Sequence, residues 1–97
     1  MGFSQVGSYD EVCKTPDDLR DDFFTFLNAF FDKHTDLQGR DMYITGHSYA
    51  GHYIPYTVTR LIEGGFKKAN IKGISIGNPY MSGKILFQSY PSFAVLN

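Results

Sequence analysis

The sequence predicts an α/β fold in which a helix, a strand, a sharp turn, a second helix and a second strand follow one another. Three observations support this fold class. Apolar residues recur at helical spacing over residues 16–33, and two short apolar runs, 41–45 and 71–76, have the length of buried strands. A helix-compatible segment, 49–63, joins the two runs. A strand, a helix and a strand in this order form a right-handed parallel crossover.

Length and composition limit what the chain can be. The 97 residues can bury one modest core, so we expect no more than one domain over residues 1–97. A net charge of −1 argues against nucleic acid or an anionic membrane surface as the main partner. No apolar run is long enough to span a bilayer, and the first residues lack the features of a signal peptide.

The first helix has a clear predicted start. Residues 1–14 are polar and rich in Gly and Ser, and should form a loop. Thr15 then resembles an N-cap, with Pro16 at the first helical position and Asp18 three residues after the cap. The helix should end near Lys33. The side chains expected on its buried face are Leu19, Phe23, Phe26, Leu27, Phe30 and Phe31.

The turn after the first strand has the residues of a nucleophile elbow. The strand leads to Ser48, with Gly46 two residues before it and Ala50 two residues after it, so the turn can close without side-chain collisions. The pattern is G-x-S-x-A-G, a variant of the usual G-x-S-x-G. Ser48 is therefore the candidate nucleophile, and the backbone N–H of Tyr49 is the candidate oxyanion donor.

The remaining elements follow from turn residues. The second helix should end at Gly64-Gly65, and Pro55 inside it should produce a kink. The second strand should end near Ile76. Beyond Asn78 we expect irregular structure.

The elbow lies within a longer block that resembles one family. Residues 46–55, GHSYAGHYIP, are similar to the G-E-S-Y-A-G-x-Y-x-P block of the serine carboxypeptidases, which have the α/β-hydrolase fold. The likeness continues over Gly2-Phe3-Ser4, over the helix and strand before the elbow, over 70–78, and over 90–94. Only the segment 80–89 matches poorly.

This resemblance implies an activity. A serine-type carboxypeptidase releases C-terminal residues from peptides through an acyl-enzyme, here at Ser48, without a cofactor. Its partner would be a peptide or protein substrate with a free C-terminus, and its location would be vacuolar, lysosomal or secreted. The family's glycine-rich oxyanion loop would precede Met1, and its acid and histidine would follow Asn97. The resemblance therefore implies that residues 1–97 are a partial α/β-hydrolase domain, which by itself should not turn over substrate.

Neither His34 nor His52 fits the role of the catalytic base. A serine hydroxyl needs a base that is oriented by an acid, and the order in this fold is serine, acid, histidine. His52 is the only histidine after Ser48, but it lies one helical turn along and should not face the hydroxyl. His34 should lie at the end of the first helix, where a cation favours the helix dipole.

His47 departs from the family pattern, which has glutamate there for binding the substrate's C-terminal carboxylate. Either His47 merely packs, as a histidine does at this place in lipases and esterases, or its protonated ring pairs with the substrate carboxylate. The departure makes an acyltransferase or esterase a second hypothesis. A truncated, non-catalytic paralogue is a third.

No metal site is predicted. Aspartates at the start of the first helix complement its dipole, which accounts for them without a metal. Cys13 is the only cysteine, and it is either paired with a cysteine elsewhere or a free thiol.

Overall fold

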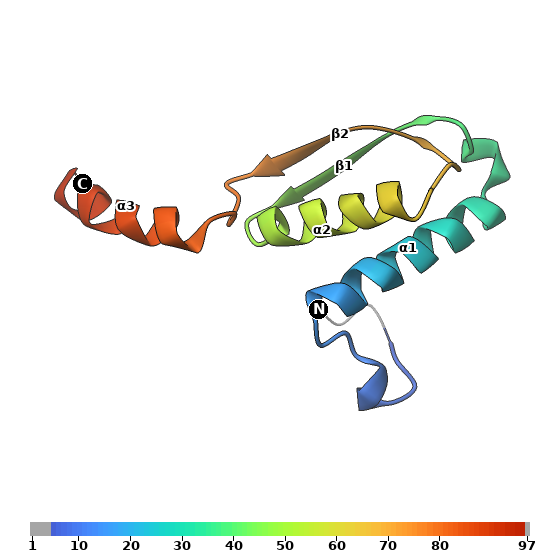
Figure 1. Cartoon of the computed structure of the whole chain (residues 1–97), viewed down its shortest axis with the longest axis horizontal. Coiled ribbons are helices and arrows are strands. Elements are labelled where there is room, and N and C mark those ends of the chain that lie inside the picture. The colour runs from blue at the N-terminus through green and yellow to red at the C-terminus, as the bar shows by residue number, and fades with distance from the viewer. Residues whose placement is uncertain (1–4, 97) are drawn as a thin grey trace.

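The computed structural model describes residues 5–96, and its elements follow the predicted order (Figure 1). The Gly2-Phe3-Ser4 block lies outside the described residues. Within the described residues, three helices and two strands follow in the order α1 (Pro16–Lys33), β1 (Asp41–His47), α2 (Ala50–Glu63), β2 (Asn70–Gly77) and α3 (Gly83–Leu96). Two short 3-10 turns, Tyr9–Glu11 and Thr35–Leu37, flank α1.

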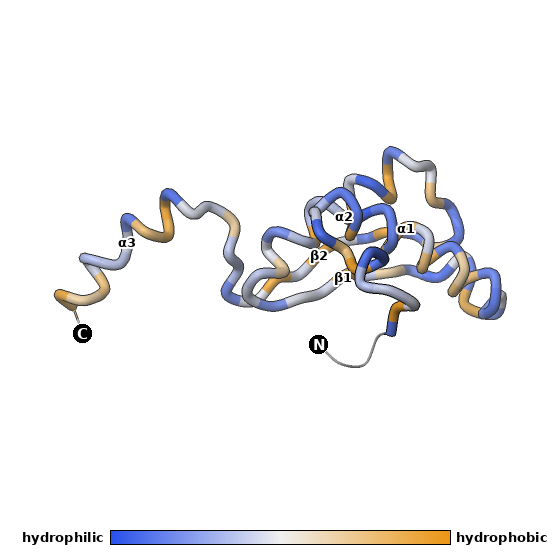
Figure 2. The backbone as a smooth tube through the Cα atoms, turned by 90° about the horizontal axis from the view of Figure 1, so that it is seen from below, coloured by the Kyte–Doolittle hydropathy of each residue, from blue (hydrophilic) through white to orange (hydrophobic). Residues whose placement is uncertain are grey.

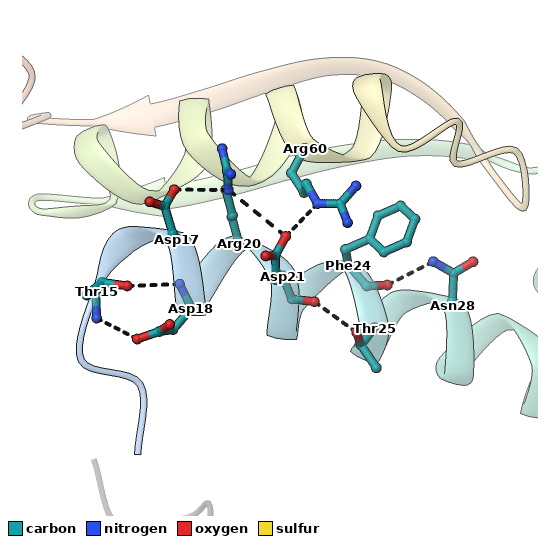
Figure 3. Close-up of polar contacts among 9 residues, drawn as sticks. All are labelled: Thr15, Asp17, Asp18, Arg20, Asp21, Phe24, Thr25, Asn28 and Arg60. Carbon is teal, nitrogen blue, oxygen red and sulfur yellow. Dashed lines mark hydrogen bonds and ion pairs between the residues drawn. The ribbon is translucent and has the colours of Figure 1, made fainter. Parts of the chain in front are cut away.

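Helix α1 begins with the predicted cap. The Thr15 hydroxyl accepts a hydrogen bond from the Asp18 N–H at 3.1 Å, and the Asp18 carboxylate accepts one from the Thr15 N–H at 2.9 Å (Figure 3). This reciprocal capping box, with Pro16 at the first helical position, satisfies two backbone donors that would otherwise lack partners. The predicted bounds of the helix are confirmed.

The buried face of α1 is rotated slightly from the predicted one. Leu27 and Phe31 are buried as expected, but the prediction for Phe26 is wrong, because its side chain is 57% exposed. Phe26 lies on the flank of the helix, with its ring between Phe23 at 6.3 Å and Phe30 at 6.1 Å. Phe24 packs against the core instead. Helical spacing predicts how wide the apolar face is. Which side chains lie at the middle of the buried face depends on where the neighbouring helix packs.

The two strands form the predicted parallel pair. The register runs from Asp41 beside Asn70 to His47 beside Gly77, with one irregularity between Met42 and Tyr43. Each strand is slightly longer than predicted. Because the strands are parallel, both deliver their following residues, from Ser48 and Asn78 on, to the same end of the sheet.

The core lies between the helices and one face of the sheet. Leu27 and Phe31 of α1, Leu61 of α2 and Ala69 before β2 are its buried centre. In Figure 1, α2 lies between the strands and α1. The other face of the sheet is open in the described chain, and Tyr43 on it is 67% exposed.

Helix α2 ends near the predicted place. Its C-cap is Gly64, whose N–H donates to the Arg60 carbonyl at 2.9 Å, and Gly65 follows with a positive φ of 68°. The helix continues through Pro55 without interruption. A kink at this proline stays a prediction.

The expectation of irregular structure beyond Asn78 is wrong. Residues 83–96 form α3, and this helix continues through Pro91. The helix has no buried residues and packs against none of the other described helices and strands. It projects from the rest of the molecule in both views (Figures 1 and 2).

Candidate active site

Ser48 occupies a strained turn between β1 and α2. Its φ is +59°, in the left-handed region that residues other than glycine seldom adopt. Three hydrogen bonds hold this conformation. The Ser48 N–H donates to the Gly77 carbonyl at 3.0 Å, and the Ser48 carbonyl accepts from the N–H groups of Gly51 at 3.1 Å and Tyr80 at 2.8 Å. The residue is exposed at the end of the sheet.

Two glycines allow the strand and the helix to approach each other at this turn. A Cβ atom on Gly46 would lie 2.5 Å from the Ala50 Cβ and 2.8 Å from the Ile54 Cδ1. A Cβ atom on Gly51 would lie 2.8 Å from both the Pro79 Cβ and the Tyr80 carbonyl oxygen. Such distances are too short for real contacts, so both positions require glycine. The sequence pattern pointed to this need at Gly46.

Tyr49 follows the serine and is the N-cap of α2, with a φ of −64°. Its backbone N–H donates to no acceptor within residues 5–96. An unpaired N–H at the start of a helix lies where the helix dipole favours negative charge, so this group is chemically suited to bind an oxyanion. The Tyr49 ring stacks on the Tyr80 ring at 5.7 Å and meets the Tyr53 ring edge-on at 4.9 Å.

His47 is the last residue of β1, and its side chain is exposed. It pairs in register with Gly77, where a Cβ atom would lie 3.3 Å from the His47 Cδ2. The imidazole forms no hydrogen bond or ion pair with the described part of the chain.

The other two histidines are engaged elsewhere. His52 lies on α2, and its ring is 5.5 Å from the ring of Tyr49 and 5.5 Å from the ring of Tyr56. His34 is the C-cap of α1, as predicted, and its ring lies 4.6 Å from Phe30. Within the described residues, neither imidazole forms a hydrogen bond with Ser48.

A shallow hollow lies on the flank of the elbow, between α2 and the chain that leads into α1. Tyr49 connects it to the turn. Its lining residues are Cys13, Lys14, Thr15, Pro16, Leu19, Tyr49, His52 and Tyr53.

Cys13 is an exposed free thiol in this structure. Its Sγ donates a hydrogen bond to the Asp22 carboxylate at 2.9 Å. This hydrogen bond, together with desolvation and the negative charges of Asp22 and Asp18, raises the pKa of the Cys13 thiol. A raised pKa lowers the thiolate fraction at neutral pH, which makes the thiol less reactive.

The aspartates at the start of α1 have individual partners. Asp17 pairs with Arg20 at 3.1 Å, Asp18 forms the cap, and Asp21 pairs with Arg60 of α2 (Figure 3). No cluster of His, Cys, Asp and Glu within residues 5–96 is arranged to hold a metal ion.

Sequence reasoning missed the segment after β2. Asn78 also has a positive φ, 43°, and this residue turns the chain so that the Tyr80 N–H reaches the Ser48 carbonyl. The Asn78-Pro79 pair, a common turn signal, was the only local indication of such a turn.

The sequence is similar to known proteins of one family. The serine carboxypeptidase family matches over residues 1–97, so the chain belongs to the serine carboxypeptidase family. Serine carboxypeptidase-like 47 of Arabidopsis thaliana is 37% identical over 98 residues, which cover 97% of this chain and 19% of that protein. Serine carboxypeptidase 3 of Hordeum vulgare is 35% identical, with 97% and 19% covered.

A shorter relative, putative serine carboxypeptidase-like 54 of Arabidopsis thaliana, is 43% identical over 72% of this chain and 37% of its own length. The chain thus spans about a fifth of the length of the first two relatives. No solved structure matches it significantly. Among the described helices, none is both long and apolar enough to cross a membrane.

Proposed function

We propose that this chain supplies the nucleophile of a serine-type carboxypeptidase. In this proposal the Ser48 hydroxyl attacks the last peptide bond of a substrate with a free C-terminus and forms an acyl-enzyme. The Tyr49 N–H stabilises the negative charge that develops on the carbonyl oxygen. The observation that carries the proposal is the left-handed Ser48, exposed at a strand end and followed by an N–H group with no acceptor within residues 5–96.

The remaining catalytic groups are proposed to come from other parts of a longer protein. Ser48 needs a histidine as base and an acid to orient it. His52 contacts tyrosine rings on α2, and no aspartate follows Ser48 in the 97 residues. We therefore expect the 97-residue polypeptide alone to be inactive. In the longer protein, which we expect to be vacuolar, lysosomal or secreted, turnover becomes possible.

A fluorophosphonate probe tests the nucleophile. The longest native polypeptide that contains this sequence is treated with the probe, digested and mapped by mass spectrometry. We expect one adduct, on Ser48, and none in a Ser48→Ala variant. Labelling at a different serine, or equal labelling of the variant, would contradict the proposal.

His47 supports a second candidate function. The family's glutamate is absent there, and the imidazole has no partner among the residues that the structure describes. An acyltransferase or esterase does not need to bind a free C-terminal carboxylate, so its site tolerates the loss of the glutamate. If instead protonated His47 binds the carboxylate, the site distinguishes a free C-terminal acid from its amide.

Two blocked dipeptides distinguish these candidates. One has a free C-terminal carboxylate and the other a C-terminal amide, and each is assayed with the wild type and with His47→Phe. A carboxypeptidase that uses His47 prefers the free acid, and His47→Phe removes the preference. An unchanged preference in His47→Phe would leave His47 with a packing role only. Hydrolysis of simple esters without hydrolysis of either peptide would favour the second candidate.

A further inference from the structure

We propose that Tyr80 is a positioning residue for the nucleophile turn, an inference that rests on the proposed function of Ser48. Tyr80 lies 32 residues beyond Ser48, after β2, and touches the turn in two ways. Its N–H donates to the Ser48 carbonyl at 2.8 Å, and its ring stacks on the Tyr49 ring at 5.7 Å with 19° between the planes.

The backbone contact fixes the strained residue. The Ser48 carbonyl accepts hydrogen bonds from Gly51 inside α2 and from Tyr80 outside it. The Ser48 N–H is held in turn by Gly77. Ser48 is therefore tied at both its N–H and its carbonyl to the segment 77–80, which holds its left-handed φ against relaxation.

The ring contact acts on the oxyanion donor. Tyr49 carries the unpaired N–H, and its ring lies between the Tyr53 ring of the same helix and the Tyr80 ring of the segment after β2. Tyr53 belongs to α2, the helix that Tyr49 caps, so the contact between these two rings stays within one element. Tyr80 instead links Tyr49 to the segment after β2, because the backbone of residues 77–80 is hydrogen-bonded to Ser48 at the end of β1.

The path of the chain supports this role. Asn78 adopts a φ of +43°, and the Gly51 position has no space for a Cβ atom next to Pro79 and Tyr80. Two left-handed residues thus end two adjacent strands, and a close backbone contact joins the turns that follow them. This arrangement fixes the position of the Tyr80 backbone, and from that position the Tyr80 ring stacks on the Tyr49 ring.

The test compares Tyr80→Ala with Tyr80→Phe in the native polypeptide that labels at Ser48. Phe keeps the stacked ring and removes only the hydroxyl. The probe is diisopropyl fluorophosphate, which lacks a peptide side chain, and the readout is the second-order rate of Ser48 modification. We expect Tyr80→Phe to react at the wild-type rate and Tyr80→Ala about three- to tenfold more slowly, the rate equivalent of one aromatic pair.

Two controls separate positioning from folding. Tyr53→Ala removes the other ring that touches Tyr49 but leaves the 77–80 segment intact, and it should slow the reaction less than Tyr80→Ala. Urea unfolding of each variant gives the folded fraction, and the rates are corrected for it. A Tyr80→Ala rate equal to the wild type after this correction would overturn the proposal.

Steady-state kinetics with a blocked dipeptide provide the second readout. A positioning residue acts in the transition state, so Tyr80→Ala should lower kcat and leave KM nearly unchanged. A raised KM with unchanged kcat would assign the ring to substrate binding and overturn the positioning role. If the wild type itself is not labelled at Ser48, the proposed function fails, and this outcome is distinct from equal labelling of wild type and variant.

Discussion

At the scale of single residues, the molecule maintains a conformation that costs free energy. A left-handed φ costs an ordinary residue roughly 1–2 kcal/mol, and Ser48 adopts one at +59°. Glycine would avoid most of this cost but would remove the hydroxyl. Serine keeps, at a cost in stability, the hydroxyl that the proposed nucleophilic role requires.

The strain at Ser48 can be measured. We expect Ser48→Gly to be more stable than Ser48→Ala by about 1 kcal/mol, because only glycine is unstrained at this φ. Urea unfolding measures the difference. At Ser75, which pairs with Thr45 in the regular part of the sheet, the order should be reversed, since glycine weakens an ordinary strand. Equal stability of the two Ser48 variants would mean that the turn relaxes.

Gly46 should not tolerate a methyl group. Gly46→Ala places a Cβ 2.5 Å from the Ala50 Cβ, and we expect it to lower the free energy of unfolding by about 1–3 kcal/mol. The matched control is Gly73→Ala in β2, where the nearest atom, the Tyr43 Cδ1, would lie at an ordinary 3.6 Å. Denaturation curves of both variants check this. A similar loss at the two positions would show that close packing at the elbow is not the cause.

At the scale of elements, a charged capping residue stabilises the N-terminus of α1. The Asp18 carboxylate accepts hydrogen bonds from the N–H groups of Lys14 and Thr15. These hydrogen bonds hold the pKa of Asp18 below its usual value, and the bond from the Lys14 N–H has the largest effect. A carboxyl with a lower pKa in the folded state stabilises the fold above the unfolded pKa. This stabilisation disappears as pH falls through the folded pKa.

Asp18→Asn should therefore make stability less dependent on pH in the acid range. We expect wild type to lose stability as pH falls below about 4, and Asp18→Asn to lose less over the same range. Thermal unfolding at several pH values measures this. Asp36→Asn is the control, because the Asp36 side chain forms no hydrogen bond or ion pair within residues 5–96. If both variants follow the wild-type curve, the cap does not contribute to the acid response.

The contact between α1 and α2 should depend more on packing than on charge. The Arg60 guanidinium pairs with Asp21 and lies over the Phe24 ring at 4.5 Å (Figure 3). Asp21 is largely exposed, so we expect Asp21→Asn to cost less than about 1 kcal/mol. Arg60→Ala also loses the contact with the ring and should cost about 1–2 kcal/mol. Urea unfolding distinguishes the two, and an equal loss would assign the contact to the ion pair.

The sequence correctly predicted those elements whose ends are marked by residues close together in the chain. The cap at Thr15, the Gly46–Ser48 spacing and the Gly64-Gly65 end all depend on residues within a few positions of one another, and each element lies where the pattern placed it. Helix α3 was missed because it buries no residues, so it lacks the apolar periodicity on which the prediction depends. The contact of Tyr80 with Ser48 was missed because it joins residues that only the crossover brings together.

At the scale of the whole molecule, the described chain is less compact than a typical domain of its length. The radius of gyration is 16.7 Å. A compact chain of this length would have roughly 12.5 Å. Helix α3 accounts for much of the difference, because it projects from the body with apolar side chains such as Ile85 and Val95 exposed. The open sheet face adds Tyr43 to the exposed apolar surface.

This surface predicts how the 97-residue polypeptide behaves alone. We expect it to associate, and sedimentation should give a mass well above 11.0 kDa, since exposed apolar helices and free strand edges pair readily. A variant with Ile85→Lys and Val95→Lys should associate less. A monomer at micromolar concentration for the original sequence would show that α3 folds back onto the body in solution.

The hydrogen bonds around Ser48 also have a consequence for biosynthesis. A ribosome makes the serine first and the residues that lock its turn, Gly77 and Tyr80, some thirty positions later. Until those residues have left the exit tunnel and β2 has docked beside β1, only the local hydrogen bond from the Gly51 N–H can hold the left-handed turn. If Ser48 is the nucleophile, as we propose, its activation waits until the two later hydrogen bonds have formed.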